Sequence, residues 1–206
     1  MRYMTLSAFE STLERDYLLL LDFDPAVEFY EEQPVTIKYC DSNGRLHRYT
    51  PDVFVRYRRA VNAASAPPSL LCEVKYRDDL RQHRAEYKPS FKAARRYARE
   101  RGWHFRWITE REIRTPYLEN VKFLRQYRDL AVDQTQQRQL LQTLAEQPVT
   151  DVEGLLATMT DDRWQRARWL PVLWHLVARR RVGVDLGQPL TPRSCLWPQS
   201  LTERPR

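Results

Sequence analysis

The chain has 206 residues, enough for one large domain or two small ones. Its composition, 42% hydrophobic and 12% aromatic, is that of a folded globular protein and excludes a disordered chain. Three widely spaced cysteines, Cys40, Cys72 and Cys195, exclude a disulfide framework and a zinc-binding pattern. The longest apolar run is Tyr17–Leu21, far below the roughly 18–20 residues of a membrane span. With no signal-peptide pattern at the start, these features predict a cytoplasmic protein without a membrane partner.

The net charge of +7 is unevenly distributed along the chain. Residues 1–90 hold 13 basic and 14 acidic side chains, whereas residues 91–115 hold 8 basic and only 3 acidic ones. A basic excess concentrated in one short block favours a polyanionic partner. The alternative is a helix whose charged face is simply solvated.

The first 115 residues predict a mixture of helices and strands. Ser11 followed by Glu14 has the spacing of a capping box, and Pro89 suggests that the basic helix begins near Lys88. The turn sequence Asp41-Ser42-Asn43-Gly44 predicts a hairpin between its flanking strands. We expect helices at 7–22, 81–101 and 110–114, and strands at 27–30, 35–39, 46–49, 52–57, 70–76 and 103–108.

The pattern changes after Thr115-Pro116. Helices are expected at 120–127, 133–147, 151–159 and 161–179, followed by a hairpin of strands 181–185 and 192–197. Several helices followed by a two-stranded hairpin are typical of a winged helix. We therefore predict an α/β domain over residues 1–115 and a helical, winged-helix-like domain over residues 116–206.

One group of residues in the predicted strands carries chemistry. Asp52 follows a proline at the start of one strand, and Glu73-Val74-Lys75 ends the next strong strand, in the order PD…ExK. Glu73 and Lys75 are two positions apart, so they share one face of a strand. Two carboxylates and the Val74 carbonyl suit a hard cation such as Mg²⁺. The lysine can orient the attacking water and offset charge that builds up on a phosphate.

The same pattern also arises by chance in a charged chain. The surrounding order of elements, a helix, several strands, a basic helix and a further strand, is that of the restriction-endonuclease-like core, and it favours a nuclease site. Glu14 on the first helix has two possible roles, as a capping partner or as a further metal ligand. Its neighbours Glu10 and Asp16 compete for the metal role.

Together these residues resemble the TnsA family, the endonuclease subunits of heteromeric (Tn-seven-like) transposases. The residues that carry the resemblance are Ser11–Glu14, Asp24–Val27, Glu32–Pro34, Thr50–Asp52 and Glu73–Lys75, in that order. Phe105–Ile113 resembles the segment that closes the nuclease domain of that family, and the later helices and hairpin resemble its C-terminal domain.

The resemblance implies a Mg²⁺-dependent nuclease, for which Mn²⁺ can substitute, that cuts the 5′ ends of a transposon. It implies a separate DDE transposase, TnsB, that acts at the 3′ ends, and an AAA+ ATPase, TnsC, that contacts the C-terminal domain. Glu14, Asp52, Glu73 and Lys75 then fall on catalytic positions. Some family members carry glutamine where this chain has Glu73, and a carboxylate there strengthens the case for a metal site.

The basic block predicts a surface that binds double-stranded DNA. Lys92, Arg95, Arg96 and Arg99 fall on one helical face and are expected to contact phosphates near the scissile bond. Such a protein would be found with the bacterial nucleoid. Two other interpretations stay open: a stand-alone nuclease of the resolvase or restriction type, and a winged-helix DNA-binding protein with a degenerate nuclease fold.

Overall fold

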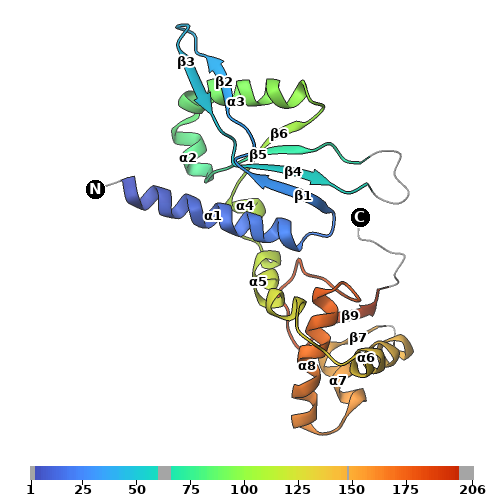
Figure 1. Ribbon diagram of the computed structural model, residues 1–206. Helices are drawn as coiled ribbons and strands as arrows, with labels where there is room; N and C mark the ends of the chain where they lie inside the picture. Colours follow the sequence, from blue (N-terminus) through green and yellow to red (C-terminus); the bar gives the residue numbers. More distant parts are fainter. Residues whose placement is uncertain (1–2, 60–65, 148, 200–206) are drawn as a thin grey trace. The chain divides into compact units, whose positions relative to one another are not determined.

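The computed structural model describes residues 3–59, 66–147 and 149–199, with side chains from Thr12 onward (Figure 1). The chain forms two compact units that divide between Arg114 and Thr115. Among the described helices, none is both long and apolar enough to cross a bilayer.

The first unit is built on a mixed sheet whose described strands lie in the order β1-β4-β5-β6. These strands are β1 (Val27–Glu32), β4 (Val53–Tyr57), β5 (Leu70–Val74) and β6 (His104–Ile108). The β1–β4 and β4–β5 pairs are antiparallel, whereas β5 and β6 are parallel and are joined by a helical crossover. The sheet confirms the predicted α/β class, and β5 is its most buried strand.

Helices cover both faces of this sheet. Leu71 of β5 packs against Ala94 and its neighbours on α3 (Arg84–Arg99). The next residue of β5, Cys72, contacts the hydroxyl of Tyr17 on α1 (Tyr3–Phe23) with 3.5 Å between oxygen and sulfur. Because successive side chains of a strand point to opposite faces, α1 and α3 lie on opposite sides of the sheet, as Figure 1 shows.

The predicted hairpin is confirmed between β2 (Ile37–Cys40) and β3 (Leu46–Tyr49). The Asp41 carboxylate closes the turn by accepting the backbone N–H groups of Asn43 and Arg45. Gly44 has φ +78°, a conformation in which a residue without Cβ is favoured. Ile37 packs into the same core as the alanines of α3, so the hairpin is anchored beside the sheet.

Two local predictions in the first unit are wrong. Helix α1 already begins at Tyr3, so residue 11 lies within the helix and the Ser11–Glu14 spacing is not a capping box at an N-terminus; the Ser11 side chain lies outside the described residues. The basic helix does not begin near Lys88, because α3 runs from Arg84 through Pro89.

A proline within a helix removes one backbone hydrogen bond, and here side-chain contacts brace the turn that precedes it. Tyr87, in the turn before Pro89, donates its hydroxyl to the Asp79 carboxylate on α2 (Arg77–Gln82) at 2.8 Å. Asp79 also contacts Nδ1 of His83 at 2.7 Å. The sequence analysis missed α2 as a separate helix. After β6, α4 (Glu110–Ile113) begins with a capping box between Thr109 and Glu112.

The second unit contains α5 (Pro116–Arg128), α6 (Gln134–Glu146), α7 (Val152–Met159) and α8 (Arg163–Ala178). Asp133, Asp151 and Asp162 cap the last three through their side chains. The strands β7 (Thr150–Asp151), β8 (Val182–Val184) and β9 (Cys195–Pro198) form an antiparallel sheet in the order β7-β9-β8. A three-residue turn joins α7 to α8, and β8 and β9 pair after them in an antiparallel arrangement.

Candidate active site

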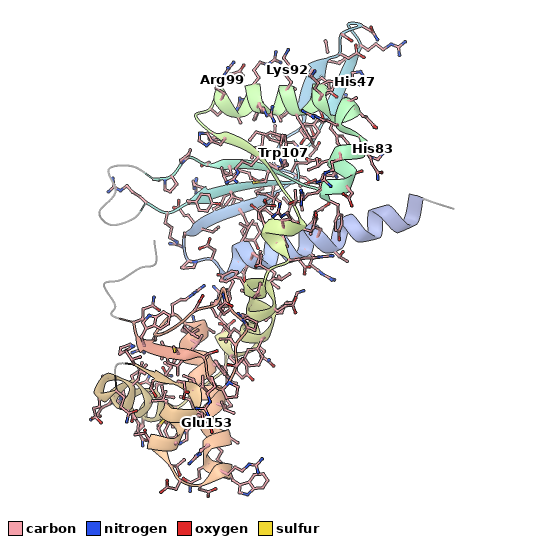
Figure 2. The ribbon with its side chains drawn as sticks, turned by 180° about the vertical axis from the view of Figure 1, so that it is seen from behind. His47, His83, Lys92, Arg99, Trp107 and Glu153 are labelled. Carbon is pink, nitrogen blue, oxygen red and sulfur yellow. The ribbon has the colours of Figure 1, made fainter. Side chains whose placement is uncertain are left out.

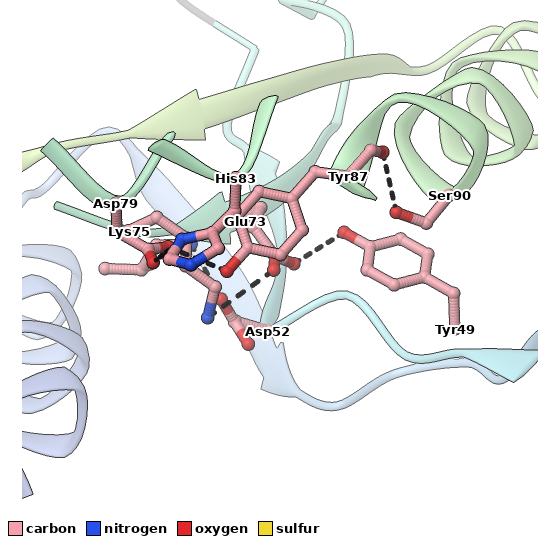
Figure 3. A network of polar contacts seen from close by, with 9 residues as sticks. Tyr49, Asp52, Glu73, Lys75, Asp79, His83, Tyr87 and Ser90 are labelled. Carbon is pink, nitrogen blue, oxygen red and sulfur yellow. Dashed lines mark hydrogen bonds and ion pairs between the residues drawn. The ribbon is translucent and has the colours of Figure 1, made fainter. Parts of the chain in front are cut away.

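The sheet brings the two predicted carboxylates together. Val53 of β4 pairs with Cys72 of β5 in an antiparallel register. Asp52 comes directly before β4 and Glu73 directly follows Cys72, so the two residues meet at this end of the β4–β5 pair, where the charge of Asp52 acts on Glu73. Asp52 and Glu73 come from positions 21 residues apart in the chain, and the register places them at one end of the sheet (Figure 3).

Asp52 also holds the end of β5 in place. One of its carboxylate oxygens accepts the backbone N–H of Val74 at 2.7 Å, where a main-chain carbonyl would otherwise continue the ladder. In an extended strand the N–H and C=O groups of one residue point to the same side. The backbone N–H of Lys75 bonds to Ile108 on the opposite, β6 side. The Val74 carbonyl therefore points toward the Asp52 side of β5.

Glu73 is buried, with 5% of its surface exposed. Burial, reinforced by the negative charge of Asp52, raises the pKa of its carboxyl from 4.5 to about 8, against the opposing effects of Tyr49 and Lys75. The Lys75 ammonium lies 3.7 Å from one Glu73 carboxylate oxygen. The structure thus joins Asp52, Glu73 and Lys75 in one group, as the PD…ExK pattern predicts.

Tyr49 is a member of this group that the sequence analysis missed. Its hydroxyl donates a hydrogen bond of 2.5 Å to the second Glu73 carboxylate oxygen, and Figure 3 shows it approaching Glu73 from the hairpin. Burial raises the pKa of Tyr49 well above its usual value, so the phenol stays protonated and can donate. The only hint in the sequence is a tyrosine three positions before Asp52 on a predicted strand.

The donor set fits a hard divalent cation. Asp52 and Glu73 offer two carboxylates whose mutual repulsion contributes to the raised pKa of Glu73, and a cation between them would relieve that repulsion. Within the described side chains, no three histidine, cysteine or acidic residues form a metal-binding cluster. The third protein ligand would therefore be the Val74 carbonyl, and water would complete the coordination.

Glu14, on α1, does not form a three-residue metal-binding cluster with Asp52 and Glu73 in the described part of the chain. Its negative charge is among the influences that raise the pKa of Glu73. Of its rivals, Asp16 lies 3.8 Å from the Arg114 guanidinium, a contact that ties α1 to the end of α4. Glu10 lies outside the described side chains.

The four predicted DNA-binding residues are all exposed on α3, but they do not share one environment. Arg95 lies over the Trp107 ring, 5.0 Å from its centroid, and lines a cavity beside β6. Arg96 lies 3.9 Å from Glu100 on the same helix. In Figure 2, Lys92 and Arg99 lie on the outer side of α3, away from Trp107.

Comparisons with known proteins identify both units. Residues 24–110 match the family described as TnsA-like endonuclease N terminal, and residues 112–186 match the family described as TnsA endonuclease C terminal. No curated protein matches the chain. The first match contains Asp52, Glu73 and Lys75, and the second contains the four helices described in the second unit. Two adjacent matches in the order of one family, over a site built from paired carboxylates and a lysine, show that the chain belongs to the TnsA endonuclease family.

Proposed function

We propose that this protein cuts the 5′ ends of a transposon, acting with a TnsB-like DDE transposase that acts at the 3′ ends. The observation that supports this most directly is the group of Asp52, Glu73 and Lys75 at one end of the sheet. Asp52 and Glu73, with the Val74 carbonyl, would hold Mg²⁺, and Glu14 is a further candidate ligand. The ion would supply Lewis acidity to the scissile phosphate.

The protein's own side chains have separate roles in this proposal. The ammonium group of Lys75 lies beside the Glu73 carboxylate, where it offsets the negative charge that develops on the phosphate during hydrolysis. Tyr49 fixes one oxygen of Glu73 and leaves the other facing Lys75. Asp52 orients the end of β5 through the Val74 N–H, so the same carboxylate also sets the position of Glu73.

The two units have different functions in this proposal. Residues 1–115 form the nuclease domain, and residues 116–206 form a winged-helix-like domain that binds a partner, a TnsC-like AAA+ ATPase. The duplex approaches the nuclease domain along α3, where Lys92, Arg95, Arg96 and Arg99 contact its phosphates. All four side chains are exposed. Because they contact phosphates and not bases, they position the duplex without recognising its sequence.

Mapping of cleavage products tests this function. Purified protein, a TnsB-like transposase and a plasmid that carries the transposon ends are incubated with Mg²⁺, and the new 5′ ends are sequenced. Cuts at the 5′ transposon ends are expected from wild type and from the control Asp161→Ala, an exposed carboxylate outside the nuclease unit. Asp52→Ala should give none, although it stays folded.

Two outcomes would change the assignment. Cleavage of any DNA by the protein alone would favour a stand-alone nuclease, and cleavage by Asp52→Ala at the wild-type rate would remove the proposed site.

Glu14→Gln tests whether Glu14 is a metal ligand or a structural residue. If Glu14 is a metal ligand, Glu14→Gln should greatly reduce cleavage and leave the melting temperature almost unchanged. Unchanged cleavage would mean that Glu14 has only a structural role.

A further inference from the structure

A cavity of about 1150 Å³ lies along β6, at the edge of the described sheet. We call it the β6 groove. It is lined by residues of α2 (within 77–82), α3 (within 84–95), β6 (within 105–107) and the start of α4 (within 109–112). All of these belong to the nuclease unit. None was recognised from the sequence as part of a cavity.

The lining of the β6 groove is strongly basic. Among the lining residues that the structure describes, seven are arginine or lysine and one, Glu112, is acidic. Glu112 is already engaged in the capping box, where it accepts the N–H and the hydroxyl of Thr109. Five of the cations come from the crossover helices: Arg77, Arg81, Arg84, Lys88 and Arg95. This distribution of charge suits a ligand that carries several phosphates.

An exposed aromatic ring lies among these cations. Trp107 is 44% exposed, although it is one of the largest apolar side chains of the unit. Phe91 supports its ring at a centroid distance of 5.8 Å, and the Arg95 guanidinium lies over it at 5.0 Å. Figure 2 shows Trp107 beside α3. Positive charge around an exposed aromatic side chain is the combination by which proteins bind unpaired nucleotides.

The β6 groove adjoins the active site. Trp107 is the direct register partner of Glu73 on the neighbouring parallel strand, and therefore projects from the same face of the sheet. Adjacent strands are only about 4.8 Å apart. Arg77, which lines the groove, follows Lys75 by two residues. A strand that is bound for cleavage would thus reach the groove within a few nucleotides of the scissile phosphate.

We propose that the β6 groove binds unpaired nucleotides of the DNA strand next to the cleavage point. A base of this strand stacks on Trp107, and the surrounding arginine and lysine side chains contact the phosphates of the strand. The volume is of the order of that of small-ligand pockets, about 300–1,000 Å³, which accommodates a few nucleotides and not the width of a duplex. This inference rests on the proposed function for the presence of a cut strand, but the binding itself does not require cleavage.

Binding of a short, labelled oligothymidine by the full chain in EDTA tests the inference. Loss of one stacking contact predicts that Trp107→Ala weakens this binding roughly 5- to 150-fold. Affinity for a duplex of the same length should stay unchanged. Trp107→Phe should retain most of the affinity, and Trp164→Ala, which removes an exposed tryptophan of the other unit, is the control. Wild-type oligothymidine affinity in Trp107→Ala would overturn the inference. An equal loss on the duplex would also overturn it, and would assign the groove to double-stranded DNA.

A charge reversal gives a second, independent test. Lys88→Glu removes a groove cation, whereas Lys38→Glu makes the same change on the exposed hairpin. Each lost phosphate contact should flatten the salt dependence of oligothymidine binding by about 0.7 in the log–log slope. An unchanged slope in Lys88→Glu would contradict a phosphate-binding groove. Failure of the proposed function is recognised separately: wild type would not cut transposon ends, whatever the oligothymidine result.

Discussion

Replacing Glu73 by glutamine should stabilise the metal-free protein, and increasingly so as the pH rises. Burial and the charge of Asp52 raise the pKa of the Glu73 carboxyl to about 8 in the folded protein, whereas the unfolded chain ionises it near 4.5. Between these values the folded state retains a proton that the unfolded state has released. Stability from this group is therefore fully present below about pH 4.5 and is lost as the pH rises toward about 8.

The size of the effect follows from the two pKa values. Within this window, the free energy of unfolding falls by at most about 1.4 kcal/mol per pH unit. Between about pH 5.5 and about pH 7.5, wild type should lose about 2 to 3 kcal/mol relative to Glu73→Gln, whose amide does not titrate. Metal binding requires the ionised carboxylate, so Mg²⁺ should stabilise wild type more than the variant.

Urea unfolding in EDTA, followed by tryptophan fluorescence at several pH values, measures this difference. Glu31→Gln, at an exposed carboxylate of β1, is the control for loss of one acidic group at the surface. A stability difference between Glu73→Gln and wild type that does not change with pH would contradict a raised pKa for Glu73. It would mean that the folded protein holds Glu73 ionised without metal.

Three further predictions concern the same domain. Tyr49→Phe removes the hydrogen bond to Glu73 and should weaken Mn²⁺ binding about 10- to 100-fold in calorimetry. Tyr39→Phe on the same hairpin is the control, and wild-type Mn²⁺ affinity in Tyr49→Phe would contradict the role of Tyr49. Lys75→Arg should lower single-turnover cleavage about 10²- to 10³-fold with little loss of DNA affinity, because a planar guanidinium does not replace a compact ammonium; near-normal turnover would remove Lys75 from the mechanism. Reversing Arg95 and Arg96 to glutamate should weaken binding to transposon-end and scrambled duplexes alike. The slope of log binding constant against log salt concentration should flatten by roughly one to two units, and an unchanged slope would mean that this face of α3 is only a solvated surface.

The group of Asp52, Glu73 and Lys75 was predictable in part, because the alternation of side chains along a strand is a short-range rule. Alternation along β5 puts Glu73 and Lys75 on one face, and the Asp41–Gly44 turn fixes the hairpin. Neither rule depends on the rest of the fold, whereas the approach of Asp52 to Glu73 depends on the pairing of β4 with β5. The mixed sheet followed from the order of the predicted elements.

The features that were missed depend on contacts between distant parts of the chain. Pro89 argued against a continuous α3, but Asp79 and Tyr87 hold the turn before it. Tyr49 reaches Glu73 across 24 positions, and no spacing rule links them. Trp107 forms part of the β6 groove only because β6 pairs with β5 in parallel and the crossover helices lie beside it. Burial of Glu73, which sets its pKa, likewise arises from the assembled domain.

We propose that Asp52, Glu73 and the Val74 carbonyl hold a divalent cation at the end of β4 and β5. An anomalous difference map from crystals of the protein grown with Mn²⁺ tests it directly. The predicted result is a peak within coordination distance, about 2.0–2.3 Å, of oxygens from all three residues, and its loss in Asp52→Ala. A peak elsewhere in the nuclease domain, or the same peak in the variant, would contradict the assignment.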